Sequence, residues 1–179
     1  MDIDGEYLVP AGRERVWEAL NDPQVLRRCI PGCEEIERVS DAEMRARILA
    51  AVGPVRAKFA TTLTLEDLEP PSRYTLAGEA KAGAAGFGRG RAQVTLAEAD
   101  GGTRLSYRAD FKVGGRLAQV GARLVTGATR KTADEFFSNL AQELGAEPAP
   151  AAAPEGRGRL LAWLAALVLA ALLLYFMLR

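Results

Sequence analysis

The sequence TRLSYRADFKVGGRLAQVGARL, residues 103–124, contains two periodicities joined by a pair of glycines. Up to residue 113, apolar and polar residues alternate, and this period of two predicts a strand of an antiparallel sheet with one dry and one wet face. After Gly114 and Gly115 the period changes to 3.6, and apolar residues recur at helical spacing as far as Leu144. The pattern therefore predicts a strand followed directly by one long helix that covers the sheet.

The segments before residue 103 complete an α+β fold. Residues 2–9 predict a first strand, and residues 13–20 predict a helix. Asp22 as N-cap and Pro23 at the first helical position predict a second short helix that stops at residues 31–32. Five more strands are expected at residues 34–39, 43–52, 56–68, 73–82 and 88–98, before the strand 103–113.

Small residues line the first half of the predicted long helix, and aromatic residues line its second half. Gly121 and Ala128 fall in the first half, whereas Phe136 and Phe137 fall in the second. Because Ala and Gly cannot fill the space between a helix and a sheet, we expect an apolar cavity there. The alternative is that all of these residues simply pack together as a core.

An apolar cavity with one or two polar groups suits a lipid-like ligand. Thr61 and Tyr107 are the hydroxyl groups expected in it. The full set of expected ligand-binding residues is Phe59, Thr61, Leu63, Val94, Tyr107, Phe111, Leu117, Val120, Gly121, Leu124 and Ala128.

The C-terminal residues 160–178 contain no charged residue, no Pro and no Gly. As a helix this run reaches about 28 Å, close to the hydrocarbon thickness of a bilayer. It predicts a transmembrane anchor, joined by a Pro/Ala linker (residues 146–159) to a domain of residues 1–145; a buried core helix is the alternative. The anchor residues singled out are Leu160, Trp163, Leu167, Leu172, Tyr175 and Leu178.

The charges beside the anchor predict its orientation. The N-terminus is acidic and polar and shows no signal peptide, so we expect the anchor to insert after synthesis. Arg157 and Arg159 precede the anchor, and the positive-inside tendency places the bulk of the chain in the cytoplasm. The expected location is the cell inner membrane, crossed once.

The composition excludes several kinds of chemistry. The chain has no His and two Cys, so it has neither a Ser-His or Cys-His nucleophilic pair nor four ligands for a Cys/His zinc site. We expect no catalytic residue, no covalent or metal cofactor, and free thiols at Cys29 and Cys33. The domain and linker are slightly acidic, which disfavours nucleic acid as a partner.

Four blocks of the chain resemble one protein family. They are VPAGRERVWEALNDPQVLRRCIPGCEEIE (residues 9–37), GFGRGRAQVTL (86–96), GGRLAQVGARLV (114–125) and FFSNLAQEL (136–144). Together they resemble the family of the carbon monoxide dehydrogenase G subunit, within the helix-grip (START/Bet v 1-like, SRPBCC) superfamily. The resemblance implies a helix-grip fold, in which a curved antiparallel sheet wraps a long C-terminal helix.

The resemblance also implies a function. It implies a membrane-associated accessory protein for a molybdenum hydroxylase of the carbon monoxide dehydrogenase type, coupled to respiratory quinones. The expectation is a membrane-anchored protein that binds menaquinone or ubiquinone in its apolar cavity and recruits that enzyme for electron transfer.

Two other functions stay open. The first is a generic carrier of lipids or other hydrophobic ligands. The second is an enzyme of the cyclase or dehydratase type known on helix-grip scaffolds. The chain disfavours the enzyme because it lacks His and because Glu79, Glu98 and Asp110 fall on the expected outer face of the sheet.

Overall fold

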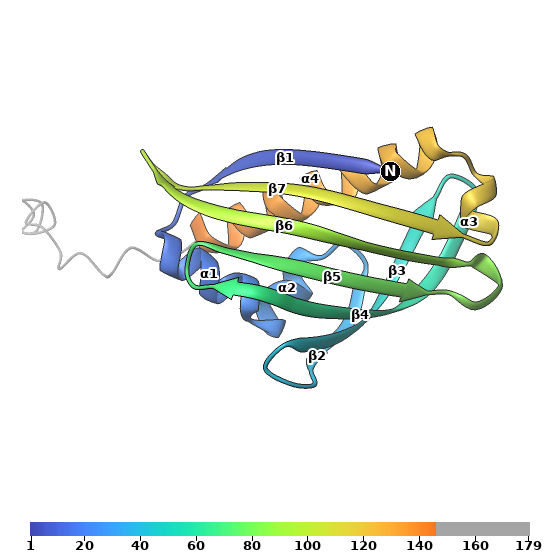
Figure 1. The fold of residues 1–179 in the computed structure, drawn as a ribbon, viewed down its shortest axis with the longest axis horizontal. Helices are drawn as coiled ribbons and strands as arrows, with labels where there is room; N and C mark the ends of the chain where they lie inside the picture. The colour runs from blue at the N-terminus through green and yellow to red at the C-terminus, as the bar shows by residue number, and fades with distance from the viewer. Residues whose placement is uncertain (146–179) are drawn as a thin grey trace, which may run out of the picture. The chain divides into compact units, whose positions relative to one another are not determined.

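A single antiparallel sheet of seven strands curves around one long helix in the computed structural model, which describes residues 1–145 (Figure 1). The strands follow the order β1-β7-β6-β5-β4-β3-β2 across the sheet. Helix α4 contacts both β1 and β3, which stand at opposite sides of that order, so the sheet must wrap around the helix. This is the predicted α+β arrangement of a curved antiparallel sheet with a C-terminal helix.

All seven predicted strands are present. Their bounds are β1 (Asp2–Val9), β2 (Cys33–Arg38), β3 (Glu43–Val52), β4 (Val55–Glu69), β5 (Arg73–Lys81), β6 (Phe87–Ala99) and β7 (Gly102–Gly114). The helices are α1 (Arg13–Asn21), α2 (Pro23–Cys29), α3 (Arg116–Gln119) and α4 (Ala122–Gly145), and a short 3₁₀ turn, η1 (Gly83–Ala85), links β5 to β6.

The two short helices begin and end as the sequence predicts. Asp22 accepts a hydrogen bond from the backbone N–H of Gln24 (2.8 Å), and Pro23 occupies the first turn of α2. This cap satisfies one of the N–H groups that a helix leaves without a partner at its start. Helix α2 ends at Cys29, just before the Pro31-Gly32 turn.

The prediction of one unbroken helix after β7 is wrong. Helix α3 ends at Gln119, and Gly121 adopts φ +99° before α4 begins at Ala122. This backbone conformation is open to Gly but strained for residues that carry a Cβ, so the chain breaks the helix there. The break resets the helical phase: Val125 is buried, whereas Leu124, expected to face inward, is 54% exposed.

The fully buried core lies at the end of the sheet that carries α1 and α2. Its most enclosed side chains come from β1, α1, α2, β6, β7 and the second half of α4: Val9, Val16, Cys29, Leu96, Thr103, Leu105 and Leu140. Thr103 is the only one of these with a hydroxyl group, which donates to the carbonyl of Ala11 (2.7 Å). The first half of α4 contributes only Val125 to the buried residues of that helix.

The predicted anchor and linker (residues 146–178) lie outside the described residues. Within residues 1–145, no helix has the length and apolar character needed to cross a bilayer.

Two glycines of the α3–α4 region should respond oppositely to substitution by Ala. A Cβ at Gly121 meets no atom within 4 Å, so Gly121→Ala should act through its positive φ alone and destabilise the protein by about 1–2 kcal/mol. Gly127 lies inside α4, and a Cβ there also meets nothing within 4 Å. Gly127→Ala should therefore stabilise by about 0.4–1 kcal/mol.

Urea unfolding of both variants, compared with the unchanged protein, measures the two effects. Equal shifts of the midpoint in the same direction would show that Gly121 does not set the helix break.

Candidate ligand-binding cavity

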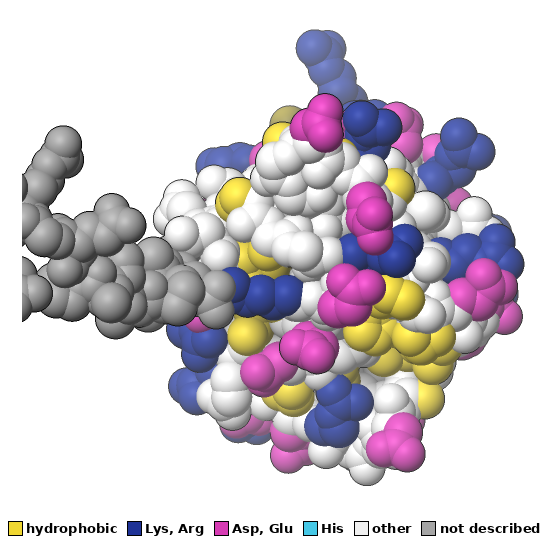
Figure 2. Space-filling view, turned by 90° about the vertical axis from the view of Figure 1, so that its left-hand side faces the viewer, with side chains coloured by type: hydrophobic (Ala, Val, Ile, Leu, Met, Phe, Trp, Pro, Cys, Tyr) yellow, Lys and Arg dark blue, Asp and Glu magenta, His cyan; other side chains and the backbone are white. Residues whose placement is uncertain are grey.

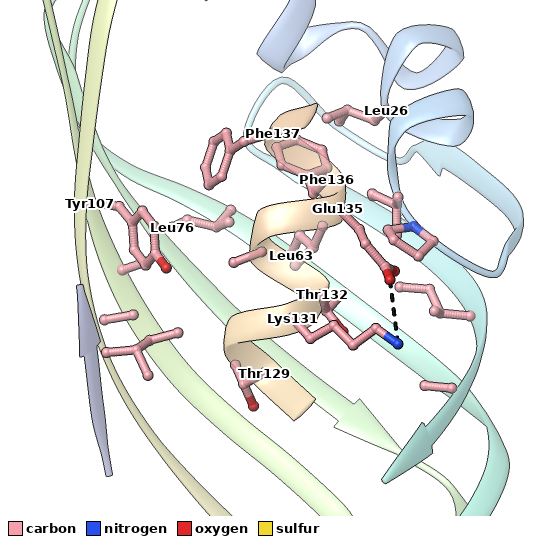
Figure 3. Close-up of a pocket in the computed structure, with 18 of the residues that line it drawn as sticks. Leu26, Leu63, Leu76, Tyr107, Thr129, Lys131, Thr132, Glu135, Phe136 and Phe137 are labelled. Atoms are coloured by element: carbon pink, nitrogen blue, oxygen red, sulfur yellow. Dashed lines mark ion pairs between the residues drawn. The ribbon is translucent and has the colours of Figure 1, made fainter. Parts of the chain in front are cut away.

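A cavity of about 660 Å³ lies between the sheet and α4 (Figure 3). Its volume falls within the range of about 300–1,000 Å³ that small-molecule sites occupy. Side chains of β1, β3, β4, β5, β6, β7, α1, α2 and α4 contribute to its wall. The lining residues are Ile3, Leu20, Leu26, Ile30, Pro31, Gly32, Met44, Ile48, Leu49, Ala50, Ala51, Val52, Leu63, Leu65, Tyr74, Leu76, Ala92, Val94, Leu105, Tyr107, Ala109, Ala128, Thr129, Lys131, Thr132, Ala133, Glu135, Phe136 and Phe137.

The cavity is open because small residues oppose one another across it. Ala92 and Ala109 line it from the sheet, and Ala128 and Ala133 line it from α4. A side chain of one methyl group cannot bridge the distance between a helix and a sheet, which is normally filled by branched or aromatic residues. The void therefore follows from the choice of residues on both walls.

Aromatic side chains close the cavity at the second half of α4. The ring of Phe137 stacks on Tyr7 (centroids 4.3 Å apart) and Tyr107 (5.6 Å), and it meets Phe136 edge to face (5.0 Å). The hydroxyl of Tyr7 donates to Asp134 Oδ1 at 2.5 Å, which ties β1 to α4. Burial and the hydrogen bond to Asp134 both raise the pKa of Tyr7, so this hydroxyl keeps its proton at neutral pH.

Two polar contacts at the last turns of α4 add to this clamp. Asn139 Nδ2 donates to the carbonyl of Cys29 (3.0 Å), and Arg28 pairs with Glu143 (2.5 Å). Both join α4 to α2. They fix the position of the helix beyond the aromatic end of the cavity.

Tyr74 is the most buried polar side chain that lines the cavity. It is 7% exposed, its ring meets Trp17 edge to face at 5.4 Å, and its hydroxyl has no hydrogen bond within residues 1–145. Burial raises its pKa, so the group is a neutral O–H. Among residues 1–145 the only fully enclosed side-chain polar atom without a hydrogen bond is Arg13 Nε, so the Tyr74 oxygen is accessible from the cavity and can donate to a ligand that accepts a hydrogen bond.

The other hydroxyl groups of the cavity already have partners. Tyr107 interacts with the hydroxyl of Tyr7, and burial is the main cause that raises the pKa of Tyr107. Thr129 donates to the carbonyl of Val125 (2.9 Å), and Thr132 donates to that of Ala128 (3.0 Å). Each threonine oxygen can still accept a hydrogen bond from a ligand.

The cavity opens between α4 and β3. The lining residues that are exposed to solvent are Lys131, Thr132 and Glu135 on α4, Ala51 on β3, and Gly32 in the α2–β2 turn. Figure 3 shows Lys131 and Glu135 on the side of α4 that faces this strand, where their ion pair spans 3.7 Å. A mouth with charged groups on one lip and an apolar interior suits an amphipathic molecule.

The structure brings only some of the sequence-predicted site residues together around this cavity. Leu63, Val94, Tyr107 and Ala128 line it. The other seven do not: Phe59, Thr61, Phe111, Leu117, Val120, Gly121 and Leu124. Whether any of these eleven residues contacts a ligand stays a prediction.

Two physical causes explain why predicted site residues lie outside the cavity. On the helix side, the break at Gly121 turns Leu124 outward, so the cavity wall begins only at Ala128. On the sheet side, strands β4 and β7 extend beyond the cavity, and Phe59 and Phe111 lie on inward positions outside it. Alternation predicts which face a residue occupies, but not whether a void stands in front of it.

Sequence reasoning missed the wall formed by α1, α2, β3 and β5. Leu20, Leu26, Ile48 and Tyr74 line the cavity from these elements. The alternation of Met44, Ala46 and Ile48 was a signal for the inner face of β3. That β3 faces α4, however, depends on the curvature of the sheet, which no local pattern encodes.

The cavity holds few groups that could act as acids, bases or ligands of a metal. Its titratable side chains are Tyr74, Tyr107, Lys131 and Glu135. Within residues 1–145, no three His, Cys, Asp or Glu residues are grouped so that they could hold a metal ion. The two cysteines are free thiols and do not line the cavity.

Comparisons with known proteins agree with this architecture. The family model of the carbon monoxide dehydrogenase G subunit (CoxG) matches residues 5–145. A conserved protein from Geobacillus kaustophilus has a similar structure (TM-score 0.76, 26% identity, 81% of this chain and 95% of that chain). The Zhui aromatase/cyclase from Streptomyces sp. R1128 (TM-score 0.63, 14% identity, 85% of this chain and 98% of that chain) shares the fold. So does a protein from Thermus thermophilus (TM-score 0.63, 18% identity, 83% of this chain and 100% of that chain). No curated protein matches the chain.

The thiol of Cys29 should react slowly while the protein is folded. Burial raises its pKa to about 11 from an ordinary value of 9.0, so at pH 8 its thiolate fraction falls about 100-fold. A Cys33→Ala variant isolates this thiol, and its alkylation by iodoacetamide can be followed by mass spectrometry. The alkylation rate of Cys29 should rise at least about 100-fold when urea unfolds the protein. Equal rates in the folded and unfolded protein would show that this thiol is not buried.

Proposed function

The chain belongs to the CoxG family, that of the carbon monoxide dehydrogenase G subunit, and we propose that it is an accessory protein that binds a hydrophobic ligand in the cavity under α4. The observation that carries this proposal is the apolar cavity of about 660 Å³ with one buried hydroxyl, Tyr74, that lacks a hydrogen bond within residues 1–145. Apolar walls favour burial of a hydrocarbon chain, and the hydroxyl offers one polar anchor for a head group.

The ligand that we propose is a respiratory quinone, menaquinone or ubiquinone. A quinone combines an isoprenoid tail with carbonyl oxygens that only accept hydrogen bonds. The tail gains about 0.8 kcal/mol for each methylene that leaves water, and a carbonyl would accept the hydrogen bond that Tyr74 can donate. The neutral state of Tyr74 supports this role, because a phenolate could not donate.

The proposed partner is a molybdenum hydroxylase of the carbon monoxide dehydrogenase type, which the family name supports. The proposed role is to recruit that enzyme to the membrane and to couple its electrons to the quinone. The apolar run at residues 160–178 supports a single-pass anchor in the cell inner membrane, with the bulk of the chain cytoplasmic. This role needs no covalent or metal cofactor in the chain itself.

We propose that the chain is not an enzyme. The Zhui protein is an aromatase/cyclase on the same fold, so a cyclase is the first alternative function. Acid–base catalysis requires a titratable group near the reacting atoms, and the charged residues of this cavity, Lys131 and Glu135, pair with each other at its mouth. A generic lipid carrier remains the second alternative, since an apolar wall does not distinguish among hydrocarbon chains.

The test of this proposal is the molecule that copurifies with residues 1–179. The protein is extracted from membranes in mild detergent, separated from free lipid, and its bound molecule is identified by mass spectrometry. A quinone at near-stoichiometric amount is the expected result. Phospholipid alone would favour the generic carrier, and an empty protein that also fails to bind added quinone would overturn the proposal.

Filling the cavity should remove the ligand without unfolding the protein. Ala128→Leu combined with Ala133→Leu adds two large side chains to the helix wall, and ligand binding should weaken about tenfold or more. Gly127→Leu is the matched control, because Gly127 is exposed and a Cβ there meets no atom within 4 Å. Binding is measured by the quenching of protein fluorescence by quinone, or by the amount of quinone bound per protein. An equal loss of binding in both variants would reject the cavity as the binding site.

Removal of the Tyr74 hydroxyl should affect ligand affinity, whereas removal of the Tyr7 hydroxyl should affect stability. Tyr74→Phe should lower ligand affinity by about 1 kcal/mol, about fivefold, and should leave the stability of the ligand-free protein unchanged, because that hydroxyl has no partner to lose. Tyr7→Phe loses the hydrogen bond to Asp134 and should lower stability by about 1–3 kcal/mol with affinity nearly unchanged. Titration with quinone and urea unfolding measure the two quantities, and a Tyr74→Phe protein with full affinity would remove Tyr74 from the site.

A further inference from the structure

The β3–β4 hairpin has no polar side chain around its turn. Residues 48–55 read ILAAVGPV, and Gly53 and Pro54 at the turn are exposed. Ala51 is also exposed, and the other five residues of this run are half-buried. Hairpin turns that face water usually carry Asn, Asp or Ser beside Gly, and an apolar turn is unfavourable in a domain surrounded by water. Such a run indicates that the hairpin meets another apolar surface.

The junction between α3 and α4 extends this apolar surface. A Cβ built on Gly53 would lie 3.2 Å from Val120 Cγ1 and 3.7 Å from Leu124 Cδ1, so the turn lies directly against the junction. Leu124 is nevertheless 54% exposed. We define the apolar cap as Val52, Gly53, Pro54, Val120 and Leu124.

The charged residues that flank the apolar cap along the chain are arginines. Residues 44–65, 80–97 and 111–133 contain twelve Lys or Arg residues and no Asp or Glu, but six of the twelve form ion pairs with acidic residues outside these ranges. Arg56, Arg116 and Arg123, which flank the cap along the chain, are exposed and form no ion pair within residues 1–145. Figure 1 shows the hairpin, α3 and the β5–β6 loop together at one end of the domain.

The opposite end of the domain has a different surface. Figure 2 shows basic and acidic side chains close to one another there. Ion pairs such as Arg28–Glu143 and Arg73–Glu69 (both 2.5 Å) balance their charges. At the end with the apolar cap, Arg56, Arg116 and Arg123 add positive charge that no acidic residue among residues 1–145 pairs with.

The apolar cap adjoins the mouth of the cavity. Val52 belongs both to the cap and to the cavity lining, and Ala51 beside it is an exposed lining residue. On α4, Leu124 lies one turn before Ala128, the first lining residue of that helix. A molecule at the cap is thus in position to enter the cavity between β3 and α4.

We propose that the apolar cap and its arginines dock on an anionic lipid bilayer, so that the mouth of the cavity opens toward the lipid. The proposal rests on the proposed binding of a hydrophobic ligand, which would then pass between bilayer and cavity with little exposure to water. Apolar residues enter the boundary between head groups and acyl chains, and arginines beside them bind anionic head groups. A second copy of this chain fits less well, because it would bring two surfaces of the same positive sign together.

Flotation with lipid vesicles tests the docking. The experiment uses residues 1–145, without the apolar tail. The Geobacillus kaustophilus protein has this fold over 95% of its own chain, whereas the match covers 81% of the present chain. The fold therefore forms in a protein that has almost no further residues. The protein should float with vesicles of phosphatidylcholine and phosphatidylglycerol, float much less with phosphatidylcholine alone, and detach as salt increases.

Two pairs of variants locate the contact on the surface. Leu124→Ser should weaken partitioning about tenfold, whereas Leu8→Ser, which changes a leucine of similar exposure (56%) on β1, should not. Arg116→Gln with Arg123→Gln should weaken it about fivefold for each charge, whereas Arg27→Gln with Arg108→Gln, which removes two exposed arginines elsewhere, should change it little.

Three results would overturn the docking. They are no flotation with anionic vesicles, equal loss in the target and control variants, or a dimer in solution that Leu124→Ser dissociates. Bound quinone is measured in the same variants at saturating quinone in detergent. Normal quinone binding without flotation would reject the docking and keep the proposed function, whereas flotation without any quinone binding would reject the proposed function alone.

Discussion

Large side chains hold α4 against the sheet mainly at its second half, and the rest of the site depends on this constraint. Phe137 stacks between Tyr7 and Tyr107, while Leu140 and Leu144 are buried against the core at the same end. These contacts set the distance between helix and sheet. The alanines of the first half then stand too far from the opposite wall to touch it, and the space between them remains open.

The cavity leaves polar groups in positions that matter for a ligand. Tyr107 and the two threonines of α4 have partners in the protein, whereas Tyr74 has none among the described residues. A hydroxyl in an otherwise apolar wall would give the proposed ligand one preferred orientation, because only a head group with an acceptor can bind it. The charged pair Lys131–Glu135 stays at the mouth, so the interior remains neutral.

The helix-grip fold supports both binding and catalysis, and the difference lies in the residues of the cavity. The aromatase/cyclase of similar structure shows that chemistry is possible on this scaffold. In this chain the absence of His and the outward positions of Glu79, Glu98 and Asp110 leave the interior without a general base of the usual kind. The proposed accessory role requires no general base.

Local patterns in the chain predict every strand and the two short N-terminal helices, because period and caps act over a few residues. Examples are the alternation in β7, the Asp22-Pro23 cap and the Gly-rich turn at residues 114–115, each of which spans a few residues. All seven strands predicted from such patterns are present in the structure. The position of the cavity depends on the assembled fold, because its walls come from strands far apart in the chain that the curved sheet brings to one helix. A single backbone angle at Gly121 changed which side of α4 faces inward, and the spacing of apolar residues could not reveal it, since both phases place leucine or valine at helical intervals.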